Sequence, residues 1–106
     1  EIPGGMVDEG EPPLESGLRE LREETGYKGE NARVIGTLLA NPAIMNNRVH
    51  TILVGNCHRT HEMQMDAGED LLTRLVPIED LPRLVKENKI RHSVILAALH
   101  YFAMEE

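Results

Sequence analysis

Residues 5–27 have the sequence GMVDEGEPPLESGLRELREETGY, in which a glycine turn and an acidic loop lead into a helical pattern. Pro12-Pro13 is a suitable helix entrance, because proline is tolerated in the first helical turn. The apolar residues between Leu14 and Thr25 recur at helical spacing, and Gly26 is well suited to end a helix. The spacing therefore predicts a helix over residues 14–25.

The acidic side chains of this predicted helix share one face. At about 100° per residue, Glu20, Glu23 and Glu24 fall within an arc of roughly 100°, away from the leucines expected to pack on a sheet. Like charges at this spacing repel unless a cation joins them. Arg19 can offset part of the repulsion, and a hard divalent cation such as Mg²⁺ can offset more. Three glutamates alone are more often an ordinary solvated acidic face, so the residues by themselves leave both interpretations open.

The segment resembles the Nudix box, Gly-x5-Glu-x7-Arg-Glu-U-x-Glu-Glu-x-Gly-U, where U is bulky and apolar. Every fixed position is matched, by Gly5, Glu11, Arg19, Glu20, Leu21, Glu23, Glu24 and Gly26, with Tyr27 an acceptable variant at the last U. A motif with so many fixed positions is specific. By this resemblance the chain is identified as a member of the Nudix hydrolases, enzymes that cut the diphosphate linkage of nucleotide derivatives.

The resemblance implies an α+β fold, an α/β/α sandwich with a mixed sheet flanked by helices. Residues 1–106 would form one Nudix domain, and we expect further strands to precede the box. Elsewhere the patterns predict strands over Ala32–Leu39, Val49–Asn56 and Leu71–Val76, and helices over Glu79–Lys86 and Ser93–Met104. The apolar stripe of the last helix is expected to pack in the core.

The resemblance also implies a magnesium site, with Mn²⁺ as an alternative ion. Glu20, Glu23 and Glu24 would ligate the metal together with the backbone carbonyl of Gly4. Arg19 would assist catalysis and, with Glu11, would hold the acids in position.

The identity of the catalytic base stays open within this resemblance. Some members of the family use the glutamate matching Glu20, whereas ADP-ribose enzymes tend to use a glutamate on a late loop. Glu69 is the candidate in the predicted loop over residues 58–70, with Glu62 as the alternate. A solvated loop acid is an equally good interpretation of either residue.

Two weaker similarities favour the ADP-ribose pyrophosphatase branch. Pro42 lies 15 positions after Tyr27, close to the place of a substrate-loop proline in that branch, and residues 69–102 resemble its C-terminal portion. ADP-ribose or a nucleotide sugar is therefore the expected substrate, and the branch implies a homodimer. The alternatives are a nucleoside triphosphate pyrophosphohydrolase and a non-catalytic Nudix domain that senses a ligand.

Composition restricts the partners further. A net charge of -7 argues against nucleic acid or an anionic membrane as the main partner, and the longest apolar run, residues 94–99, is too short to span a bilayer. A single cysteine, Cys57, cannot form an internal disulfide and fits a cytoplasmic protein. The pair His58 and His61 lacks the helix-borne acid of a zinc protease, so we expect no metal there.

Overall fold

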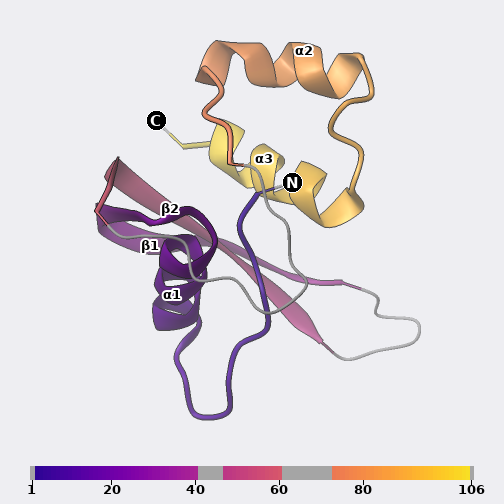
Figure 1. The fold of residues 1–106 in the computed structure, drawn as a ribbon. Coiled ribbons are helices and arrows are strands. Elements are labelled where there is room, and N and C mark those ends of the chain that lie inside the picture. The colour runs from indigo at the N-terminus through magenta and orange to yellow at the C-terminus, as the bar shows by residue number, and fades with distance from the viewer. Residues whose placement is uncertain (1, 41–46, 61–72, 106) are drawn as a thin grey trace, which may run out of the picture.

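The computed structural model describes residues 2–40, 47–60 and 73–105. In chain order it contains helix α1 (Pro13–Thr25), strands β1 (Tyr27–Leu39) and β2 (Arg48–Arg59), a short 3₁₀ helix η1 (Ile78–Asp80), and helices α2 (Leu81–Lys86) and α3 (Ser93–Ala103), shown in Figure 1. Helices and strands thus occur together, which confirms the predicted α+β class.

Helix α1 has the ends that the sequence predicts. Pro12 is its N-cap and Pro13 its first residue. At the other end Gly26 adopts a left-handed conformation with φ 77°, and its N–H donates to the carbonyl of Arg22 at 2.8 Å. A side chain at position 26 would make this conformation costly by roughly 1–2 kcal/mol. Gly26 therefore fixes the point at which the chain leaves α1 and enters β1.

Strands β1 and β2 form a two-stranded antiparallel sheet whose pairing runs from Tyr27 opposite Arg59 to Leu39 opposite Arg48. Both strands extend beyond the predicted residues 32–39 and 49–56. The extra pairs form because the ladder tolerates irregularities, with register shifts between positions 28 and 33. Asn31 and Asn56 have positive φ values of 54° and 49°. Asparagine tolerates this conformation, so turn-like residues are absorbed as bulges rather than ending the strands.

Helices α1 and α3 cover opposite faces of this hairpin (Figure 1). The side chain of Ile52 in β2 packs against Gly17 of α1, whereas the ring of Tyr101 in α3 packs against Gly36 of β1. Gly36 pairs with Thr51, the neighbour of Ile52. Since successive strand residues point to opposite faces, the two contacts lie on opposite sides of the sheet. The helix–sheet–helix order is that of the predicted sandwich.

The predicted strand over Leu71–Val76 is wrong for its described part. Thr73–Val76 pair with no strand among the described residues, and the Leu75 side chain is 76% exposed. Leu71 and Leu72 lie outside the described residues. Apolar alternation alone does not make a strand, because the backbone groups need a neighbouring strand to bond.

The sheet formed by the described residues is purely antiparallel. The parallel pair that a mixed sheet requires is not among them.

The C-terminal helices match their predictions closely. The predicted segment Glu79–Lys86 divides into η1 and α2, and the last helix begins at Ser93 as predicted. Its N-cap is His92, whose Nδ1 accepts the N–H of Val94 at 3.1 Å. Ile95 and Ala98, from the predicted apolar stripe, are the buried apolar side chains among the described residues. No helix in the described part of the chain is long and apolar enough to cross a membrane.

Candidate active site

Arg19 is the centre of the candidate site, and its firmest partner is Glu11 from the preceding loop. Its Nε donates to Glu11 Oε2 at 3.0 Å, and its Nη2 donates to Glu11 Oε1 at 3.2 Å. Such two-point contacts fix orientation as well as charge. Hydrogen bonding to Arg19 lowers the pKa of Glu11, and the same contact raises the pKa of Arg19 above its ordinary value. The pair therefore anchors the acidic loop to the helix.

The third nitrogen of the Arg19 guanidinium, Nη1, hydrogen-bonds to two further acids of the box. Nη1 donates to Glu20 Oε1 at 3.1 Å and to Glu23 Oε2 at 3.2 Å. Asp8 adds a longer ion pair of 3.6 Å to Nη2. One cation thus faces four carboxylates, and the cluster keeps a net negative charge that attracts cations.

Glu20 is the most enclosed of these acids, with 16% of its side chain exposed. Burial raises the pKa of Glu20, and repulsion from Glu24 and Glu23 acts in the same direction, against the lowering effect of Arg19. The environment therefore disfavours a charged Glu20 unless more positive charge is brought to it.

The glycine turn before the helix touches the other side of the acid cluster. The N–H of Gly4 donates to Glu24 Oε2 at 2.9 Å. Gly5 lies so close to the Glu20 carboxylate that a Cβ at this position would overlap it. The turn and the helix therefore hold the carboxylates from two sides.

The acids fit a hard cation by their chemistry, since Mg²⁺ prefers oxygen ligands. They are not closed around a metal position: among the described residues, no group of three acidic, histidine or cysteine side chains is arranged as a ready metal site. The carboxylates do not face a common point because each binds another donor. Glu20 and Glu23 are turned toward Arg19, and Glu24 is turned toward the N–H of Gly4. Binding a metal would require the carboxylates to exchange these donors for the ion.

Several predicted site residues cannot be placed. Glu69 and Glu62, the candidate late-loop bases, lie outside the described residues, as do Pro42 and His61. The structure brings Arg19, Glu11, Glu20 and Glu23 together as the box motif implies.

Sequence reasoning missed one residue of the site, Asp8, and gave another, Ser16, no bonding role. Asp8 joins the Arg19 cluster from an irregular loop, where no periodic signal marks it. Ser16 is 3% exposed and hydrogen-bonds to Glu11, which helps lower the pKa of that carboxyl. Helical spacing predicts its position, because Ser16 falls on the Glu20 side of the helix one turn earlier.

Comparison with known proteins decides the family. A model of the NUDIX domain matches residues 1–99. The chain belongs to the Nudix family. Within it, this Nudix domain is 30% identical over 107 residues to an ADP-ribose pyrophosphatase of Bacillus subtilis, in an alignment covering all of the chain and 58% of that protein. It is 27% identical over 107 residues to a methanol dehydrogenase activator of Bacillus methanolicus, with the same coverage of 100% and 58%.

A shorter match reaches higher identity. The Nudix domain is 43% identical over 54 residues to an ADP-sugar pyrophosphatase of Mus musculus, covering 51% of the chain and 25% of that protein. The chain thus spans little more than half the length of these relatives, or less. The resemblance to the ADP-ribose pyrophosphatase branch is nevertheless confirmed, because several similar proteins carry that name.

Proposed function

We propose that this Nudix domain hydrolyses the diphosphate linkage of a nucleoside diphosphate derivative in a Mg²⁺-dependent reaction. The observation that carries the proposal is the convergence of Glu20 and Glu23 on one nitrogen of Arg19, inside a complete box. ADP-ribose or a nucleotide sugar is the favoured substrate, because proteins named for these two activities are similar to the chain.

The chain's own residues would bind and orient the reacting groups. Glu20, Glu23, Glu24 and the carbonyl of Gly4 would hold Mg²⁺, with Mn²⁺ as an alternative ion. Bound there, the metal would neutralise the diphosphate, activate a water molecule and stabilise the leaving phosphate. Arg19 keeps Glu20 and Glu23 on the same side of α1 and links both to the acidic loop through Glu11.

A base must take the proton of the attacking water, and we propose either Glu20 or the late-loop Glu69 for this role, with Glu62 as the alternate. A comparison of turnover in Glu24→Gln and Glu69→Gln separates the two. Loss of turnover in both variants supports the late-loop base. Near-wild-type turnover in Glu69→Gln, with Glu24→Gln inactive, removes Glu69 from the mechanism and leaves Glu20 and Glu62 as the candidates.

The substrate class is tested with a panel of ADP-ribose, nucleotide sugars, dinucleotides and nucleoside triphosphates, each with Mg²⁺. We expect ADP-ribose or a nucleotide sugar to be cleaved fastest, with AMP and ribose 5-phosphate as the products from ADP-ribose. Exclusive cleavage of triphosphates would make the protein a triphosphate pyrophosphohydrolase instead. Binding without cleavage of any compound would make it a ligand-sensing domain.

We also infer a homodimer. The support is the similarity to the ADP-ribose pyrophosphatase branch, for which the resemblance implies a homodimer. Sedimentation of the full-length protein tests this, and a monomer at micromolar concentration contradicts it.

A cytoplasmic location is proposed on the thiol of Cys57, which is free and exposed. Such a thiol persists in a reducing compartment. Cell fractionation tests the location, and recovery in an extracellular or membrane fraction contradicts it.

A further inference from the structure

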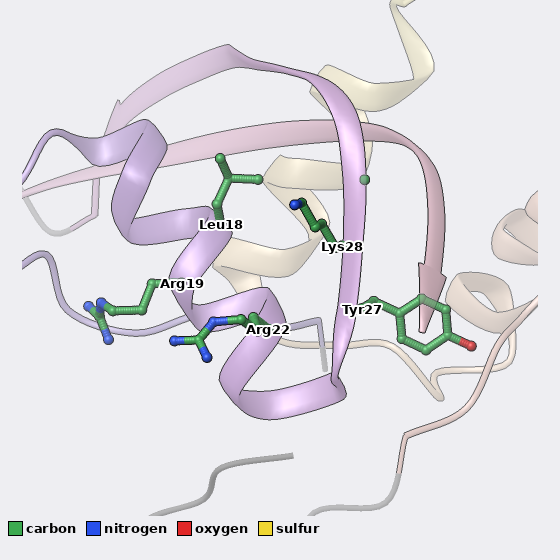
Figure 2. A pocket seen from close by; sticks show the side chains of 6 residues that line it. Leu18, Arg19, Arg22, Tyr27 and Lys28 are labelled. Carbon is green, nitrogen blue, oxygen red and sulfur yellow. The ribbon is translucent and has the colours of Figure 1, made fainter. Parts of the chain in front are cut away.

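A cavity of about 310 Å³ lies beside α1, and no acid of the box lines it. It is lined by Leu18, Arg19, Arg22, Tyr27, Lys28 and Gly29, from the last turns of α1 and the start of β1 (Figure 2). At about 100° per residue, Arg22 lies roughly 160° around the helix from both Glu20 and Glu24. The Arg22 side of the cavity therefore faces away from Glu20 and Glu24, whereas Arg19 lies between the cavity and the acid cluster.

The charge of this cavity is opposite to that of the chain. Its lining contains three cationic side chains and no acid, although the net charge of the whole chain is -7. Figure 2 shows Arg19 and Arg22 projecting from α1 on the same side, with Lys28 reaching from β1 toward the helix. Cationic side chains gathered at one cavity produce a positive local potential that attracts anions, to the extent that neighbouring acids do not neutralise them.

The three cations contribute unequally. Arg19 already binds Glu11, Glu20 and Glu23, and Arg22 makes a further contact of its own. The backbone of Lys28 pairs with His58 in the sheet, but its side chain forms no hydrogen bond or ion pair with the described residues. Lys28 therefore carries most of the uncompensated charge at the cavity.

We propose that this cavity binds a phosphoryl group, as free phosphate or as a phosphate monoester, at a site separate from the box acids. A phosphate dianion suits an ammonium beside a guanidinium, because the ammonium supplies point charge and the guanidinium supplies directed donors. The volume exceeds what a bare phosphate fills. Leu18 provides an apolar wall for the organic part of an ester.

The test is a titration of the ¹⁵N-labelled protein, followed by NMR in the presence of a chelator. Removing metal prevents phosphate from binding at the box acids through an ion, so the outcome is independent of the proposed hydrolysis. One arm uses inorganic phosphate and the other uses ribose 5-phosphate. We expect saturable shifts of the amides of residues 27–29, with tighter binding of ribose 5-phosphate if the occupant is an ester.

Variants assign the binding to the cavity. Lys28→Gln is expected to weaken binding about tenfold, equivalent to about 1.4 kcal/mol, and Arg22→Gln is expected to weaken it as well. Lys86→Gln, at an exposed lysine of α2, is the control and should leave affinity within about twofold. Thermal melting of each variant shows whether the fold is retained.

Three results would overturn the proposal. The first is unchanged phosphate affinity in folded Lys28→Gln and Arg22→Gln. The second is the same amide shifts with sodium chloride at equal ionic strength, which would indicate only screening of surface charge. The third is a pattern of shifts confined to the amides of Gly4, Gly5 and Glu24, which would place phosphate at the acid cluster instead.

Discussion

The backbone of Gly5 lies directly against the carboxylate of Glu20. A Cβ built on Gly5 would overlap this carboxylate, and even the more distant oxygen, Oε2, would be 2.8 Å away. The obstructing atoms are the end of a flexible side chain, so they can move without disturbing the helix. A methyl group at position 5 would therefore displace the acid rather than unfold the protein.

We expect Gly5→Ala to lower Mg²⁺ affinity by about tenfold or more, the scale for losing a positioning contact at a metal site. The melting temperature of the metal-free protein should change little. Calorimetric titration and thermal melting measure the two effects. Gly55→Ala in β2 is the matched control, because its nearest neighbour would be in ordinary contact at 3.5 Å. Unchanged Mg²⁺ affinity in Gly5→Ala would show that the Glu20 position is unimportant for the metal.

Replacement of Arg19 should make the fold depend on added cations. In Arg19→Gln, the carboxylates of Glu11, Glu20 and Glu23 lose the positive charge that joins them. We expect a lower melting temperature without metal and a larger rise on adding Mg²⁺ than in the wild type, because the ion replaces the missing charge. Arg19→Lys keeps the charge but not the two-point contact. Its Mg²⁺-induced rise in melting temperature should therefore lie between those of the wild type and Arg19→Gln. Equal Mg²⁺-induced shifts in all three proteins contradict this coupling.

The Glu11–Arg19 contact should stabilise the fold in a pH-dependent way. Because the pKa of Glu11 is lowered below 4.5 in the folded protein, its contribution is present above the unfolded pKa and is lost as pH falls through the folded pKa. We expect Glu11→Gln to be less stable than the wild type at pH 7, with the difference shrinking below about pH 4. Urea unfolding across pH 3–7 measures this. Glu9→Gln, at an exposed position of the same loop, should show no such convergence.

Thr25 should stabilise the junction between α1 and β1 through its hydroxyl. Its Oγ1 donates to the carbonyl of Leu21 at 2.5 Å and accepts the N–H of Tyr27 at 3.1 Å. Thr25→Val keeps the shape of the side chain but removes the hydroxyl from the Leu21 carbonyl and the Tyr27 N–H. We expect this to lower the free energy of unfolding by about 1–3 kcal/mol. Thr25→Ser keeps the hydroxyl and should lose less. Urea unfolding compares the three proteins, and a valine variant as stable as the wild type would remove this role.

The sequence predicted the elements that local chemistry controls. Helix α1 needed only its proline entrance, its leucine spacing and Gly26 to be placed within one residue. The last helix was equally clear from its apolar stripe. Strand limits were less predictable, because Asn31 and Asn56 resemble turn residues and become bulges only when a partner strand is present.

The sequence by itself determined which acids share one face of α1, since helical geometry fixes the angles between them. It also determined the family, because the box has so many fixed positions. Only the tertiary structure decided where those acids turn. Arg19 draws Glu20 and Glu23 to itself, while the glycine turn meets Glu20 and Glu24 from the other side. The same folding placed Lys28 beside Arg22 at a cavity. The contacts of the glycine turn with Glu20 and Glu24, and the placement of Lys28 beside Arg22, join residues from different elements, and helical periodicity carries no information about how separate elements pack.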